Sequence, residues 1–331
     1  MINALRSGLR SLMPKTPSAT SLRGETPPAV AAANLAALQA RPCLAPDWTP
    51  RFVHSHSREF RDLRAAYSYF GEVRVDVTGA PPLVMLNHND DLVAATYFFF
   101  GRDAYESLSV RLFAGLSVGA DAVLDIGAYT GLFGLVAAKT ARGAHVSSFE
   151  PIPHIAARAR LNGALNRLGD YVVAQKAVGE APGAAELTLY GGHAGTTGAS
   201  LAEKPRSDVG RIEVEVTTID EYASGLGGRR IGLIKLDTEG AEVAAMAGGA
   251  GVFREHGPIV LSEILNDAAL AAQCDAMAAH GYDAWHVDER QRKLKRVRAD
   301  APPQSYGNVL FARGRDISRA RAIAVAFRSG R

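Results

Sequence analysis

The chain has 331 residues, of which 47% are hydrophobic and 21% charged, values that are typical of a large soluble domain with extensions. Its two cysteines, Cys43 and Cys274, have no CxxC partner and no histidine at ligand spacing, which argues against a disulfide framework or a zinc site and favours a reducing compartment. No run of about 18 apolar residues is present, and residues 1–10 lack the apolar core of a signal peptide, so we expect a cytoplasmic protein without a membrane span.

The net charge of +3 hides a strong segregation of charge along the chain. Residues 1–45 contain five Lys or Arg and one acid. Residues 286–331 contain twelve Lys or Arg and four acids. Residues 46–285 therefore hold 20 basic and 29 acidic groups, and such an acidic body argues against a nucleic-acid substrate. The basic stretch 290–298 has two interpretations, a solvated hairpin or loop and a contact with an anionic partner.

The chain before residue 121 is expected to form two regions. Residues 1–45 are interpreted as a disordered or mobile leader, because prolines interrupt it, with one short Ala-rich helix over 29–40. Residues 46–120 are interpreted as a lead-in subdomain, and its aromatic run 97–100 is predicted to be core packing, because no basic residues are interleaved with it. In this region we expect strands over 72–77 and 83–86, and helices over 90–101 and from 105 onward.

From residue 121 strands and helices alternate, which predicts a mostly parallel seven-stranded sheet with helices on both faces. Strands are expected near 122–126, 145–149, 171–175, 231–237, 258–264, 282–287 and 306–313. Helices are expected near 131–141, 153–167, 240–254 and 267–280.

Two alternating segments interrupt this pattern and predict a β-hairpin insertion. They are residues 185–190 and 211–217. The Gly-rich loop 191–201 between them is a candidate flap over a site, and its His193 is a weaker candidate for a general base. The catalytic domain is placed at 121–313, and residues 314–331 are expected to be a basic C-terminal helix or tail.

The segment 123–131 is an apolar strand that runs into a turn carrying Asp125, Gly127 and Gly131, and a second strand ends at Glu150. In a Rossmann-like sheet this order holds an adenosine-bearing cofactor, with the terminal carboxylate accepting hydrogen bonds from the ribose hydroxyls. The spacing is not GxGxxG, and a carboxylate at Asp125 would repel a pyrophosphate but suits a sulfonium or ammonium group. S-adenosylmethionine carries both groups, so the motif favours a methyltransferase over a purely structural turn.

A second unusual segment is the apolar strand at 231–237, which ends in Lys235, Asp237 and, beyond it, Glu239. Alternation would place these three side chains on one side, at the edge where cofactor and substrate meet. Charges in a buried strand are costly unless they are paired, so a structural Lys–carboxylate pair with helix-capping acids stays open as the alternative. Glu263 ends the next strand in the same way.

Taken together, these motifs resemble the FkbM-type family of S-adenosylmethionine-dependent methyltransferases. The segments that carry the resemblance, in the family's order, are Leu124–Gly131, Phe149–Pro151, Ala177–Val178, Ser200–Leu201, Thr218–Asp220, Lys235–Glu242, Pro258–Glu263, Gly281–Tyr282 and Asn308–Phe311. The resemblance implies a Rossmann-like class I methyltransferase fold over 121–313. One departure is visible, because the family pattern DxGANxG has Asn where this chain has Tyr129.

The resemblance implies O-methylation of a hydroxyl of a sugar, glycan or secondary metabolite. Asp125 and Gly127 are expected to face the methionine part of the cofactor, Glu150 the ribose, and Ala177 and Val178 the adenine. The remaining cofactor-binding candidates are Ala128, Tyr129, Thr130, Gly131 and Asp237. Asp237 is also the first candidate for the general base, with Lys235 and Glu239 behind it.

Several alternatives stay open at this stage. Asp237 with Asn266 and Asp267 would suit a metal-assisted reaction, although Asp267 equally well caps the following helix. A protein or RNA methyltransferase and a non-catalytic cofactor-binding scaffold are the other functions. The acceptor and the oligomeric state are left open.

Overall fold

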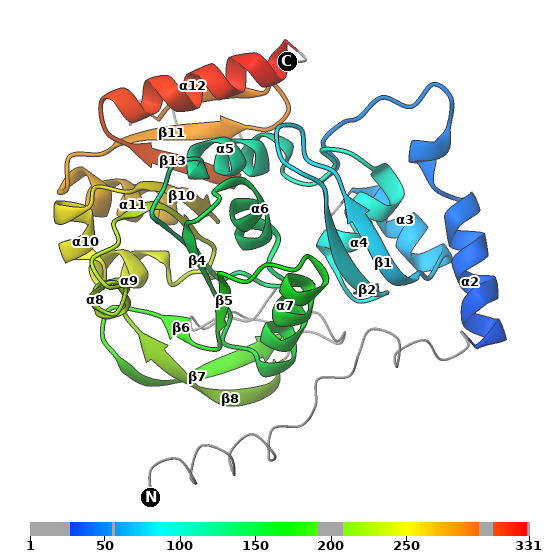
Figure 1. Cartoon of the computed structure of the whole chain (residues 1–331), viewed down its shortest axis with the longest axis horizontal. Coiled ribbons are helices and arrows are strands. Elements are labelled where there is room, and N and C mark those ends of the chain that lie inside the picture. The colour runs from blue at the N-terminus through cyan, green and yellow to red at the C-terminus, as the bar shows by residue number, and fades with distance from the viewer. Residues whose placement is uncertain (1–26, 55–56, 191–207, 298–306, 330–331) are drawn as a thin grey trace, which may run out of the picture.

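The computed structural model describes residues 27–54, 57–190, 208–297 and 307–329. Its centre is an eight-stranded sheet in the order β12-β11-β13-β10-β9-β3-β4-β5 (Figure 1). The strands are β3 (Ala122–Ile126), β4 (His145–Phe149), β5 (Tyr171–Ala174), β9 (Ile231–Leu236), β10 (Ile259–Ile264), β11 (Asp283–Asp288), β12 (Lys293–Arg296) and β13 (Gly307–Ala312).

The five strands β5, β4, β3, β9 and β10 are parallel, and β13 lies antiparallel between β10 and β11. All seven expected strands are present, which confirms the predicted α/β sheet. The eighth strand, β12, extends the sheet by pairing antiparallel with β11. The basic stretch thus forms the exposed arm of a hairpin, in which Lys295 pairs with Asp288 and Arg296 with Asp283.

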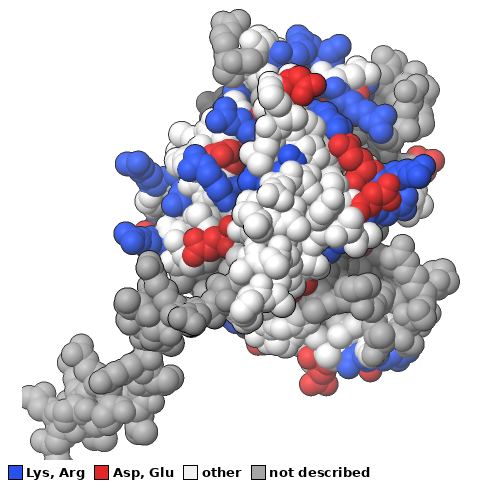
Figure 2. Space-filling view, turned by 90° about the vertical axis from the view of Figure 1, so that its right-hand side faces the viewer, with Lys and Arg blue, Asp and Glu red and all other residues white. Residues whose placement is uncertain are grey.

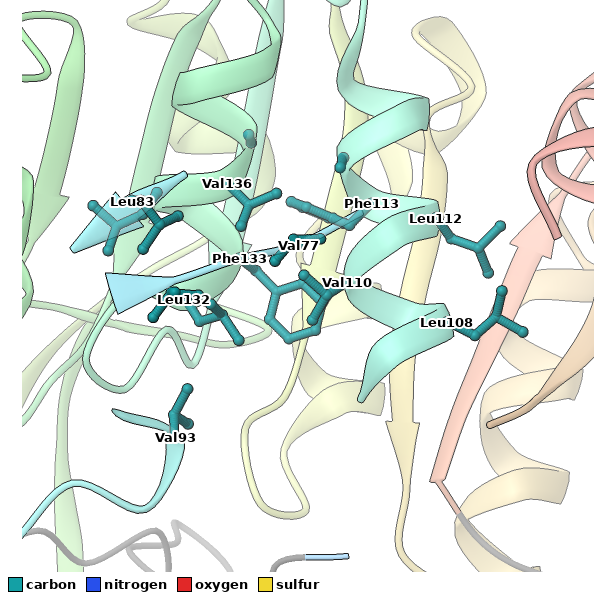
Figure 3. Close-up of a cluster of buried hydrophobic side chains, with 14 of the residues drawn as sticks. Val77, Leu83, Val93, Leu108, Val110, Leu112, Phe113, Leu132, Phe133 and Val136 are labelled. Carbon is teal, nitrogen blue, oxygen red and sulfur yellow. The ribbon is translucent and has the colours of Figure 1, made fainter. Parts of the chain in front are cut away.

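Both faces of the sheet are covered by helices, and successive residues of a strand enter different cores. On β3, Val123 packs in one hydrophobic cluster and Leu124 in the other. The first cluster lies under α5 (Ser107–Ser117), α6 (Leu132–Thr140) and α12 (Arg315–Arg328), and its side chains from α5 and α6 interdigitate in Figure 3. The second lies under α8 (Ile219–Ser224), α9 (Glu242–Ala247), α10 (Ala250–Glu255) and α11 (Asp267–Ala278). Burial on both faces explains why β3, β9 and β10 are mostly apolar.

The expectation of one helix over 240–254 was wrong, because the chain forms α9 and α10 with a break at Gly248 and Gly249. A Cβ atom on Gly248 would lie 2.1 Å from the carbonyl oxygen of Gly179, so the close approach of another loop requires glycine here. Glycine destabilises the interior of a helix, so a glycine at this position favours a break between α9 and α10. Helix α7 (Pro153–Leu165) follows β4 as expected.

The predicted hairpin insertion is confirmed. Strands β7 (Gly183–Tyr190) and β8 (Asp208–Thr217) pair antiparallel, and the short β6 (Ala177–Val178) pairs with β8 in parallel. The candidate flap with His193, and the Ser200–Leu201 pair, lie outside the described residues.

The N-terminal region packs against the same core as the central sheet. It consists of α2 (Pro28–Gln39), the 3₁₀ turn η2 (Pro42–Leu44), α3 (Arg58–Ala66), the antiparallel pair β1 (Phe70–Val75) and β2 (Leu83–His88), and α4 (Leu92–Phe100). The predicted core position of Tyr97–Phe100 on α4 is confirmed, because all four side chains are buried. Helix α3 was not expected from the sequence.

Helix α2 is tied to β1 by Asn34, whose amide both donates to the carbonyl and accepts from the N–H of Phe70, at 2.8 Å each. The helix contains no charged residue, and the face that carries it shows a broad uncharged band with charged side chains on either side (Figure 2). None of the helices in the described part of the chain combines the length and the apolarity that a membrane crossing needs.

Candidate active site

A cavity of about 670 Å³ opens at the carboxyl ends of β3, β4, β9 and β10, a volume in the range of small-molecule sites. Strand order reverses between β3 and β9, and open α/β sheets bind ligands at such a switch point. The predicted site residues that line this cavity are Asp125, Gly127, Ala128, Tyr129, Thr130, Glu150, Ala177, Val178, Lys235, Asp237 and Glu239. Gly131 is not among the lining residues and instead caps the N-terminus of α6.

Gly127 brings the ends of three strands together. Its φ of +77° is in the left-handed region, and a Cβ atom here would lie 1.7 Å from the backbone oxygen of Asp237. Its N–H and that of Ala128 both donate to the carbonyl of Phe149, at 3.0 and 2.9 Å. Only glycine fits between β3, β4 and β9 at this point, so the turn places Glu150 and Asp237 at one edge.

Asp125 is 1% exposed and braces the start of α6. Its Oδ2 accepts a hydrogen bond from the N–H of Gly134 at 2.8 Å and one from Ser148 Oγ at 3.3 Å. Burial raises the pKa of this carboxyl to about 6, so it is mostly ionised at pH 7. Asp125 therefore holds the cavity wall as well as lining it.

Glu150 is 6% exposed, and each of its carboxyl oxygens accepts one backbone hydrogen bond. Oε2 accepts from the N–H of Tyr129 at 3.1 Å and Oε1 from that of Ile152 at 2.9 Å. Burial raises the pKa of Glu150 to about 8. Because each carboxylate oxygen can accept two hydrogen bonds, capacity for two donors such as ribose hydroxyls remains.

Tyr129, where the chain departs from the family pattern, has a φ of +49°. Among non-glycine residues Asn tolerates this left-handed conformation best, which explains why the pattern has Asn. In this chain the Tyr129 hydroxyl donates to the carbonyl of Asp90 at 3.4 Å, and the Asp90 side chain is held by Arg158. The substitution thus connects the glycine turn to the N-terminal region.

An apolar part of the cavity lies beside Glu150. Ala177 and Val178 line it together with Ile152, Ile155 and Leu187, and all five side chains are buried. The insertion sheet supplies one wall, through β6 and β7. Such a surface suits a flat, largely apolar ring system.

At the end of β9, Lys235 and Asp237 form an ion pair, with Nζ and Oδ2 2.9 Å apart. The Lys235 side chain is 1% exposed and its ammonium group lies 5.1 Å from the centre of the Phe133 ring. The neighbouring acids Asp237, Glu106 and Glu263 raise the pKa of Lys235 above its usual value despite burial, so the lysine stays charged. The structural pair considered from the sequence is present, and it lies within the cavity wall.

Glu242, rather than Glu239, organises the loop after β9. Its Oε1 accepts hydrogen bonds from the N–H of Thr238 at 2.8 Å, the Thr238 hydroxyl at 2.9 Å and the N–H of Gly240 at 3.1 Å. Glu239 itself has a φ of +57° and lines the cavity. The EGxE part of the sequence motif therefore contains one acid at the cavity and one that shapes the loop.

Among the lining residues that were not singled out as site residues from the sequence are Glu106, at the start of α5, and Asn308 on β13. Asn308 Nδ2 donates to Glu106 Oε2 at 2.8 Å, across 202 residues of chain. Glu106 lies outside the alternating segment, so only tertiary structure could bring it to the site. Asn308 was quoted within a motif, but its strand runs antiparallel, which places its start at the carboxyl edge of the parallel strands.

Of the residues of the metal-assisted alternative, Asp237 lines the cavity, whereas Asn266 and Asp267 are not among its lining residues. Asn266 caps α11, accepting from the N–H of Ala269 at 2.9 Å, and Asp267 lies in the first turn of that helix. In the described ranges, no group of three or more His, Cys, Asp or Glu side chains could hold a metal ion.

Residues 125–284 match the family model of the methyltransferase FkbM domain. This segment is a methyltransferase FkbM domain. The chain therefore contains an S-adenosylmethionine-dependent methyltransferase domain, as the sequence resemblance implied. No curated protein sequence matches the chain.

Among solved structures, the FkbM methyltransferase from Methylobacillus flagellatus KT is similar at 16% identity, with a TM-score of 0.38. The match covers 58% of this chain and only 43% of that one, so this chain spans less than half the length of that relative. An O-methyltransferase from Bacillus cereus in complex with SAH is 13% identical over 62% of this chain and 78% of that one, with a TM-score of 0.36. The ribosomal protein L11 methylase from Lactobacillus delbrueckii subsp. bulgaricus is 12% identical over 62% of this chain and 77% of that one, also with a TM-score of 0.36.

Proposed function

We propose that the chain transfers a methyl group from S-adenosylmethionine to a hydroxyl of a sugar, glycan or secondary metabolite. The observation that carries the proposal is the Lys235–Asp237 pair, which lies in the same cavity as Glu150 and on the strand next to the glycine turn. One cavity would thus combine a site for adenosine with a carboxylate that can accept a proton.

The residues present fit S-adenosylmethionine. Glu150 retains capacity for two hydrogen-bond donors, and the apolar wall beside it suits a purine ring. Asp125 supplies a buried negative charge near the turn, which suits a cation. When bound, the cofactor supplies an electrophilic methyl group on a sulfonium centre.

The chain's own contribution would be to position the acceptor and to remove its proton. A hydroxyl held at Asp237 would transfer its proton to that carboxylate as the new O–C bond forms. Lys235 holds the Asp237 side chain in place, since Nζ also donates to the carbonyl of Leu236 at 3.4 Å. Alignment of the reacting atoms would provide much of the rate enhancement.

Calorimetry of the full chain with S-adenosylhomocysteine, followed by kinetics, tests this proposal. We expect the wild type to bind, and Glu150→Ala to weaken binding at least about tenfold, because two hydrogen bonds to a buried carboxylate are lost. The surface variant Glu255→Ala, whose side chain is 66% exposed, serves as the matched control. Failure of the wild type to bind would overturn the cofactor site.

The role of Asp237 is tested separately, by Asp237→Asn. A general base predicts a loss of kcat with little change in the binding of S-adenosylhomocysteine. If the variant instead loses cofactor affinity and keeps kcat at saturation, Asp237 contacts the cofactor's amino group and is not the base.

A further inference from the structure

Three neighbouring strands each place one polar side chain at the same level of the cavity. Glu263 on β10 is the direct register partner of Asn308 on β13, and Leu236 pairs with Ser262, so Asp237 follows at the level of Glu263. All three side chains line the cavity. Because adjacent strands are about 4.8 Å apart, the three form a continuous row along the sheet edge.

Two members of this row have buried oxygen atoms without a hydrogen-bond partner among the described residues. They are Oε2 of Glu263 and Oδ1 of Asn308. Asn308 is only 4% exposed, and its Nδ2 already donates to Glu106 Oε2 and to Ser109 Oγ, which fixes the amide with its oxygen unused. Buried acceptors are normally satisfied, so both atoms point to a ligand that supplies donors.

The charges of these side chains determine which kind of ligand can donate hydrogen bonds to the row. Lys235 balances the carboxylate of Asp237. The negative charge of Asp237, together with burial, raises the pKa of Glu263 well above its usual range. Because Lys235 is already paired with Asp237, the row presents acceptor oxygens and not a free cation, which favours hydroxyl groups and disfavours phosphate or carboxylate groups.

We propose that Asp237, Glu263 and Asn308 form a subsite that binds the hydroxyl groups of an uncharged polyol, such as a neutral sugar ring. The subsite lies on the opposite side of β3 from Glu150, because the strand order is β13-β10-β9-β3-β4. This inference rests on the proposed function and names the class of acceptor for it.

Saturation-transfer NMR on the full chain, saturated with S-adenosylhomocysteine, tests the subsite with three probes. They are methyl glucoside, glucosamine and glucose 6-phosphate. We expect transfer to methyl glucoside, no gain in affinity for glucosamine, and at least about tenfold weaker binding of the phosphate. A preference for glucosamine or for the phosphate would overturn the neutral assignment.

Paired variants of Glu263 separate an acceptor role from a charge role. Gln can donate to Asp237 and still present a carbonyl oxygen, so Glu263→Gln should keep methyl glucoside binding, whereas Glu263→Met should weaken it about tenfold. Equal loss in both variants would overturn the acceptor role of Glu263. Asn308→Leu provides the second test and should also weaken binding, and unchanged binding would remove Asn308 from the subsite.

Binding of S-adenosylhomocysteine distinguishes failure of the polyol subsite from failure of the cofactor site. If the wild type binds S-adenosylhomocysteine but none of the polyol probes, the subsite fails while the cofactor site stands. If it does not bind S-adenosylhomocysteine, the proposed function fails first.

Discussion

Glu150 is a buried carboxyl group, and the pKa of about 8 makes it a pH-sensitive part of the candidate cofactor site. The folded-state pKa exceeds the usual value of 4.5, so the folded chain binds this proton more tightly than the unfolded chain. The contribution of Glu150 to stability is therefore largest at low pH and declines as the pH rises towards 8.

For ligand binding we expect the opposite trend. Ribose hydroxyls that donate to Glu150 favour its ionised form, so the affinity for adenosine should rise by up to about tenfold per pH unit between pH 6 and 8 and then level off. Adenosine has no group that titrates in this range. Calorimetry at several pH values checks the trend, and Glu150→Gln should give a flat profile. A flat profile in the wild type would contradict the prediction.

At Tyr129 the packing of the aromatic ring offsets an unfavourable backbone conformation. Tyr129→Asn should relieve about 1 kcal/mol of strain at a φ of +49° but lose about 2 kcal/mol of aromatic burial, since the ring packs against two hydrophobic clusters. We therefore expect Tm to fall by a few degrees in a thermal melt. Tyr129→Phe keeps the ring and should melt close to the wild type. A higher Tm for the Asn variant would show that strain is the larger effect.

At the scale of elements, the loop between β9 and α9 depends on one carboxylate. Glu242 is 2% exposed, and Glu242→Ala would leave two backbone N–H groups and a hydroxyl of this loop without their acceptor. We expect a loss of about 2–4 kcal/mol in the free energy of unfolding, measured by urea denaturation. Glu242→Gln retains an acceptor oxygen and should lose much less. If Ala and Gln are equally destabilising, the charge of Glu242 and not its hydrogen bonding holds the loop.

The sequence predicted the elements of the central sheet well, because hydrophobic periodicity is a local signal. The parallel strands β3, β9 and β10 are mostly apolar and buried, and the glycine turn after β3 carries its own conformational requirement. The break between α9 and α10 could not be predicted, since it depends on the backbone of Gly179, some 70 residues earlier. Strand β12 was not among the expected strands, because its exposed basic residues carry no burial pattern, although a solvated hairpin was one interpretation of this stretch.

At the scale of the whole molecule, the N-terminal region, the central sheet and α12 share one hydrophobic cluster. On α12 the cluster includes Ala320, Ala324 and Phe327, and Arg319 donates to the carbonyls of Gly115 and Val118 on and after α5. Residues that the sequence divided into lead-in, catalytic domain and tail are thus packed together. A shared core predicts that these regions unfold together.

The two tryptophans allow this to be measured, because Trp48 lies in the N-terminal region and Trp285 on β11, and both pack against the shared cluster. Trp48→Phe leaves Trp285 as the fluorescent reporter, and Trp285→Phe leaves Trp48. We expect the tryptophan fluorescence of each variant to change in a single cooperative unfolding transition. After correction for the stability of each variant by circular dichroism, the fluorescence and backbone midpoints should coincide. Separate midpoints would show that the lead-in is an independent domain.

The sequence by itself determined the sheet, the glycine turn, the acid at Glu150 and the family of the domain, because each depends on residues that are close together in the chain. The acceptor side of the cavity was decided only by the tertiary structure. Asn308 meets Glu263 because β13 runs antiparallel beside β10, and Glu106 reaches them from the start of α5. These contacts join residues up to about 200 positions apart, and no local pattern encodes which distant oxygen will be left without a partner.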